Sequence, residues 1–112
     1  MAEDDVTDDS LPSLTARDVC QVLREVTFER RTLTRACDQV WGVLDDGLFI
    51  VDVDGWRIAL RIEGSALSHC DRCDAPDGRR WAFDSGHRVD TNPVALLSTW
   101  EHAMLESLLT RL

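Results

Sequence analysis

The chain has 112 residues, four cysteines and a formal net charge of −9, and 44% of its residues are hydrophobic. This length and composition are typical of one soluble globular domain and exclude a fibrous or fully disordered chain. The longest aliphatic–aromatic run, residues 48–51, is far shorter than the ~20 residues of a membrane-spanning helix. The acidic balance also disfavours nucleic acid as a partner, because it repels phosphate.

The negative charge is concentrated at the N-terminus. Five of the first ten residues are acidic and none is basic, whereas the rest of the chain has 16 acidic and 12 basic residues. Because residues 1–12 contain few apolar groups, we predict a mobile acidic tail there and a single domain over residues 13–112. An acidic N-terminus is also unlike a secretory signal peptide, which predicts a cytoplasmic protein with reduced thiols.

The first element predicted is a helix that begins after Thr15. An acidic residue, Asp18, follows this threonine at the spacing of a capping box. Apolar side chains then recur on one helical face: Val19, Val22, Leu23 and Val26. The arginine-rich segment 30–37 is interpreted as a polar connection, with a second helical turn as one alternative.

The middle of the chain predicts β-strands. A first strand is expected at residues 40–44, and Asp54-Gly55 then separates two alternating apolar segments. Such a pair predicts a two-residue hairpin turn in which both residues have positive φ. The predicted register places these residues opposite each other: Phe49 and Leu60, Val51 and Ile58, Asp52 and Arg57, and Val53 and Trp56.

A second hairpin is predicted from residues 66–72, through the turn residues 76–78, to residues 79–84. A C-terminal helix is expected to be capped by Asn92 and to begin at Pro93. Its apolar stripe is expected to face the core and comprises Leu97, Trp100, Met104, Leu105, Leu108, Leu109 and Leu112. The fold class predicted is α+β, an antiparallel meander of about four to five strands flanked by an N-terminal and a C-terminal helix on one face.

The C-x-x-C motif formed by Cys70 and Cys73 is the clearest candidate for a metal-binding site. Two thiolates at this spacing can bind one tetrahedral zinc ion if the backbone turns between them. His87 and one of His69, Cys37 or an aspartate would then complete the site. Since no second C-x-x-C follows, we favour the interpretation that both cysteines are ordinary small side chains at a strand end. The leading prediction is therefore no cofactor, with zinc as the alternative.

A metal-dependent nuclease is a third interpretation. The segment 84–87, placed after a C-x-x-C, resembles the His-Asn-His nucleases, which implies that His87 activates water and that His102 or Asn92 helps to hold a divalent ion. The sequence lacks that family's second cysteine pair and basic surface. We therefore assign no catalytic residue and expect the protein not to be an enzyme.

The leading functional prediction is a non-enzymatic module that binds another protein, as a regulator, an inhibitor or an immunity-type factor. Trp81 follows Arg79 and Arg80, with Asp77 nearby, and tryptophan and arginine are enriched in interface hot spots. The alternative is that Trp81 packs in the core. The acidic charge favours a neutral or cationic protein partner.

Three stretches carry a resemblance to a known family: residues 53–57 (VDGWR), residues 70–86 (CDRCDAPDGRRWAFDSG) and residues 96–101 (LLSTWE). Over about residues 14–112 the chain resembles a family of small bacterial proteins known as a domain of unknown function. The resemblance implies a small bacterial cytoplasmic protein. It supplies no catalytic residue, ligand or partner.

Overall fold

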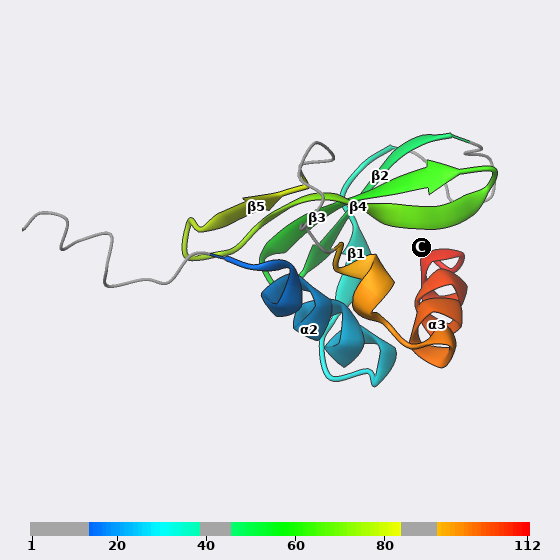
Figure 1. Cartoon of the computed structure of the whole chain (residues 1–112), viewed down its shortest axis with the longest axis horizontal. Helices are drawn as coiled ribbons and strands as arrows, with labels where there is room; N and C mark the ends of the chain where they lie inside the picture. Colours follow the sequence, from blue (N-terminus) through cyan, green and yellow to red (C-terminus); the bar gives the residue numbers. More distant parts are fainter. Residues whose placement is uncertain (1–13, 39–45, 84–91) are drawn as a thin grey trace, which may run out of the picture.

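The computed structural model describes residues 14–38, 46–83 and 92–112. In chain order the elements are helix α2 (Ala16–Thr27), strands β1 (Leu33–Arg35), β2 (Gly47–Val53), β3 (Trp56–Glu63), β4 (Ala66–Asp74) and β5 (Arg80–Ala82), the 3₁₀ turn η2 (Val94–Leu96) and helix α3 (Thr99–Leu109). The strands form one antiparallel sheet in the order β1-β2-β3-β4-β5. Both helices and η2 lie on the same side of it (Figure 1). The predicted α+β meander is therefore confirmed.

Two predicted segments lie outside the described residues. These are the acidic tail at residues 1–12 and the strand at residues 40–44.

Helix α2 begins as the sequence predicts. The Thr15 hydroxyl accepts a hydrogen bond from the Asp18 backbone N–H at 3.2 Å, and the Asp18 carboxylate accepts one from the Thr15 N–H at 3.0 Å. The predicted apolar face is buried against the sheet and η2. The helix ends at Thr27, and Glu29 then takes a positive φ of 60°.

The segment after α2 contains strand β1, so the alternative of a second helical turn there is wrong. Leu33–Arg35 pair with Val51–Val53 of β2. A three-residue edge strand is too short to show a period of two in its sequence. Its extended conformation is instead set by its pairing with β2.

The β2–β3 hairpin has the predicted register, including Phe49 opposite Leu60 and Asp52 opposite Arg57. The turn residues Asp54 and Gly55 have φ values of 50° and 94°, as a two-residue turn of this type requires. Asp52 and Arg57 approach to 3.8 Å on the face that points away from the helices. The opposite face of this hairpin contributes buried apolar side chains to the core: Phe49, Val51, Val53, Ile58, Leu60 and Ile62.

Strand β4 does not alternate simply. Two irregularities in its pairing with β3 leave Ser68 and Asp71 without a residue opposite them. Each bulge inverts the alternation of side chains. As a result Leu67, Cys70 and Cys73, spaced by three, are all buried in the core.

The C-terminal helix begins later than predicted. Pro93 leads only into the short turn η2, and Leu97 is extended before α3 begins at Thr99. The cap is Ser98, whose hydroxyl accepts from the Glu101 N–H at 3.1 Å while Glu101 accepts from the Ser98 N–H at 2.9 Å. A capping box satisfies two backbone donors at once. The Asn92 side chain instead bonds to the Cys70 backbone and to the Val94 N–H at the start of η2.

Candidate interaction surface

Polar side chains from the C-terminal segment cover the outer edge of β4 beyond the end of β5. Asn92 Oδ1 accepts from the Cys70 N–H and Asn92 Nδ2 donates to the Cys70 carbonyl, both at 2.8 Å. At Leu67, the Glu106 carboxylate accepts from the backbone N–H at 2.8 Å, and His102 Nε2 lies 3.2 Å from the carbonyl oxygen. These side chains thus bond to the backbone N–H and C=O groups of β4 that a neighbouring strand would otherwise satisfy.

Two residues that a nuclease would need for metal binding are thus engaged with the main chain. Asn92 is buried, with 8% of its surface exposed, and both ends of its amide bond to Cys70. His102 contacts Leu67. His87, which would activate water, lies outside the described residues.

The C-x-x-C cysteines are buried among apolar side chains. Burial raises the pKa of the Cys70 thiol far above its usual value and raises that of Cys73 to about 12. The Cys70 thiol lies 3.5 Å from the Arg72 carbonyl oxygen, to which it donates. Both residues therefore behave as small apolar groups with protonated thiols.

The zinc hypothesis also needs a histidine beside these thiols. His69 precedes Cys70 on the strand and so points to the opposite face, where its Nδ1 lies 2.9 Å from the Ser68 hydroxyl and its ring packs 5.3 Å from Phe83. Within residues 14–38, 46–83 and 92–112, no three His, Cys, Asp or Glu side chains are grouped so that they could hold a metal ion.

We expect the freshly purified protein to be free of zinc, because the thiols of Cys70 and Cys73 are packed as core groups. Native mass spectrometry should give the mass of the metal-free chain, and a strong chelator should leave the melting temperature unchanged. Stoichiometric zinc whose removal lowers the melting temperature would contradict this and would restore the Cys70, Cys73 and His87 site.

The predicted partner-binding residues lie on the β4–β5 turn and on β5. Arg79 pairs with Asp77 at 2.9 Å, and Arg80, 82% of whose side chain is exposed, pairs with Asp74 at 3.2 Å. Trp81 lies opposite Cys73 and packs partly buried against the core. Arg80 and Trp81 therefore point to opposite faces of β5.

Among the described residues, the large aromatic side chains that are well exposed lie elsewhere. Phe28, just after α2, is 52% exposed and Trp100, in the first turn of α3, is 53% exposed. Their ring centroids are 5.6 Å apart. We call these two residues the aromatic pair. The prediction that Trp100 lies in the core is wrong, because α3 buries the neighbouring face formed by Glu101, Leu105 and Leu109.

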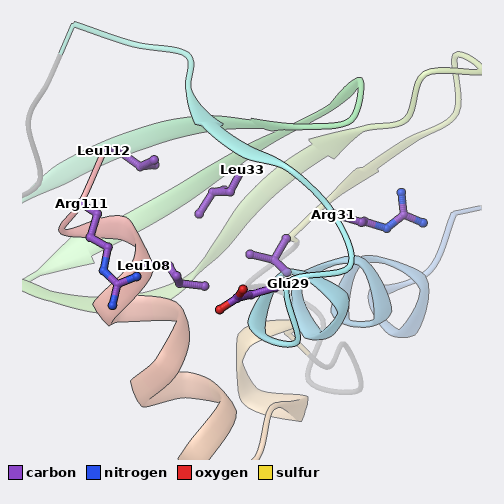
Figure 2. A pocket seen from close by; sticks show the side chains of 7 residues that line it. Glu29, Arg31, Leu33, Leu108, Arg111 and Leu112 are labelled. Atoms are coloured by element: carbon purple, nitrogen blue, oxygen red, sulfur yellow. The ribbon is translucent and has the colours of Figure 1, made fainter.

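A cavity of about 250 Å³ lies between the end of α2, the segment that leads into β1 and the C-terminal half of α3 (Figure 2). Its lining residues are Val26, Glu29, Arg31, Leu33, Leu108, Arg111 and Leu112. We call it the C-terminal cavity. Trp100, Met104 and Leu108 recur every four residues, so one partly exposed apolar stripe on α3 connects the aromatic pair with this cavity.

A family model described as Domain of unknown function (DUF7693) matches residues 13–111. The chain belongs to the DUF7693 family. This membership confirms the resemblance seen in the sequence and assigns no activity. No curated protein and no solved structure matches the chain. Of the two α-helices in the described part of the chain, neither has the length and apolar character needed to cross a membrane.

In this DUF7693 domain an ion pair holds the aromatic pair in place. Arg24 Nε lies 2.9 Å from Glu101 Oε2, and this ion pair joins α2 to α3. Arg24 lies one helical turn before Phe28, and Glu101 directly follows Trp100. The Ser98 N–H and the Arg24 guanidinium both hold the pKa of Glu101 below its usual range. The two rings are therefore presented by helix ends that are fixed to each other.

Proposed function

We propose that this domain acts by binding another protein, and that the aromatic pair is the centre of the contact surface. The observation that carries the proposal is the pair itself, two adjacent rings that are each more than half exposed. Aromatic side chains contribute strongly to interfaces because they bury a large apolar area with little loss of conformational entropy. A partner surface that covers Phe28 and Trp100 would recover this area.

The chemistry of the partner follows from the charge of the chain. The whole chain carries a net charge of −9 and repels acidic partners, so a neutral or cationic protein surface fits best. Guanidinium or ammonium groups on that surface would also interact favourably with the exposed faces of the two rings. The four free cysteines support the cytoplasm as the proposed compartment.

The β5 edge is the competing surface. Arg80 is well exposed there, but Trp81 presents only part of its ring and on the other face of the strand. The aromatic pair offers two exposed rings on one surface. It therefore supports the proposed function better than the sequence-predicted set of Asp77, Arg79, Arg80 and Trp81.

Site-specific photo-crosslinking in cells of the natural host tests the proposal. Benzoylphenylalanine is introduced at Trp100, at Arg80 or, as a control, at Arg57, whose side chain is 54% exposed on the opposite face of the sheet. We expect irradiation to give a discrete adduct with another protein from position 100 and none from position 57. Phe28→Ala should remove the adduct formed at position 100, because the partner would lose half of the aromatic surface.

Two results would contradict the proposal. An adduct from position 80 and none from position 100 would place the contact surface at the β5 edge. The same adducts from positions 57 and 100 would show random collision rather than a binding surface. A product of twice the mass of the chain reports self-association and does not count as partner binding.

A further inference from the structure

We propose that the C-terminal cavity is the interface between two copies of this chain, with Glu29 of each copy facing Arg111 of the other. The proposal goes beyond partner binding at the aromatic pair and rests on different residues. It commits the exposed opening of the cavity to one occupant, a second copy of the chain.

The first argument is the charge on the rim of the cavity. Glu29 and Arg111 carry opposite charges, and neither side chain has an ion-pair partner among the residues that the structure describes. Arg31, the third charged residue of the rim, is already bound to Glu25 at 2.5 Å. One acid and one base that lack an ion-pair partner in the described part of the chain therefore border the same opening.

The placement of these charges suits a twofold axis. Figure 2 shows Leu108 between the side chains of Glu29 and Arg111. In a symmetric dimer both copies use the same surface, so that if one residue contacts a second, the second also contacts the first. An axis that passes close to Leu108 brings Glu29 of each copy to Arg111 of the other and forms the same ion pair twice.

The charges also argue against a simpler occupant. An acidic peptide would be attracted by Arg111 but repelled by Glu29. A basic peptide would be attracted by Glu29 but repelled by Arg111. A second copy presents both signs in the complementary order. Charge complementarity of this kind selects one partner over others.

The apolar lining supplies the driving force. Val26, Leu33, Leu108 and Leu112 line the cavity, and Leu33, Leu108 and Leu112 are only partly buried in the single chain. When a second copy closes the opening, these side chains leave water, which favours association. The ion pairs then fix how the two copies are oriented.

The backbone at Glu29 agrees with a role for its side chain. Its φ of 60° lies in the left-handed region, where glycine or asparagine at a helix end is least strained. A charged side chain is nevertheless placed here, at the edge of the cavity. Local backbone energetics alone would favour a different residue.

Sedimentation velocity over a range of concentrations at physiological salt tests the proposal with the full chain. We expect the wild type to be in a monomer–dimer equilibrium. Glu29→Arg and Arg111→Glu should each raise the dissociation constant at least about tenfold, because each sets like charges against one another twice. The double variant that carries both changes should return to within about threefold of the wild type, because the pairs are restored with exchanged signs.

Arg17→Glu is the matched control, because it reverses an exposed charge in the first turn of α2, away from the cavity. It should leave the dissociation constant unchanged, and circular dichroism should show that all variants fold. A wild type that stays monomeric up to its solubility limit would overturn the proposal. So would a double variant as weak as the single variants, because this would show that Glu29 and Arg111 do not face each other. Crosslinking at Trp100 is independent of either result.

Discussion

Asn92→Ala is expected to lower the free energy of unfolding by about 3 kcal/mol, because it leaves a buried backbone N–H and C=O without partners, each at a cost of about 1–3 kcal/mol. The Asn92 amide makes both hydrogen bonds to Cys70 at 2.8 Å, and Oδ1 also accepts from the Val94 N–H at 3.0 Å. Urea denaturation followed by circular dichroism measures the change. Gln21→Ala on the exposed face of α2 is the control and should change the free energy by less than about 0.5 kcal/mol.

Asn92→Asp gives a sharper test of the same hydrogen bonds. A carboxylate can still accept from the Cys70 N–H but cannot donate to the Cys70 carbonyl, and burial disfavours its charge. The protonated carboxyl can donate, so the folded state should raise the pKa of this group. Its stability should therefore approach that of the wild type as the pH falls from about 7 to about 5. If Asn92→Ala were as stable as the wild type, water would be replacing the amide at the strand edge.

The parts of the fold that could be predicted are those in which local signals agree. In the β2–β3 hairpin, Asp54-Gly55 sets the turn and the alternation of apolar residues sets the register, and both require the same pairing. The start of α2 is likewise encoded within four residues by Thr15 and Asp18. Such features depend little on the rest of the chain.

The parts that were missed depend on contacts between distant segments. Strand β1 exists because Leu33–Arg35 pair with β2. Three residues are too few to show an alternation of apolar and polar side chains that would predict this pairing. Asn92 precedes a proline and therefore matches the start of a helix, but its amide bonds to Cys70, 22 residues earlier. Asn92 Oδ1 also accepts from the Val94 N–H at the start of η2, but the bonds to Cys70 could not be predicted from the neighbouring residues.

The surroundings of the candidate residues also depend on contacts that the local sequence does not specify. A C-x-x-C favours metal binding only when the backbone turns between the cysteines, whereas the bulge at Asp71 turns both Cys70 and Cys73 into the core. The exposure of Trp100 could have been predicted, because α3 has more apolar residues than one helical face can bury. The spacing of Trp100, Met104 and Leu108 marks the second stripe.

The two phenylalanines Phe28 and Phe49 should separate stability from binding. Phe49 is fully buried in the centre of the sheet, whereas Phe28 is 52% exposed beside Trp100. Phe49→Ala is expected to lower the free energy of unfolding by about 3–5 kcal/mol, because it removes a ring from a packed core and leaves a cavity. Phe28→Ala makes the same chemical change at the surface and should cost less than about 1 kcal/mol.

The comparison bears on function because the chemical change is identical at both positions. Urea denaturation gives the two free energies, and crosslinking from position 100 gives partner binding. If the aromatic pair is the contact surface, Phe28→Ala abolishes the adduct while the domain remains folded. A loss of stability at Phe28 as large as that at Phe49 would instead show that its ring supports the packing of α2 on α3. The exposure of the aromatic pair would then have a structural cause, and the proposed contact surface would be wrong.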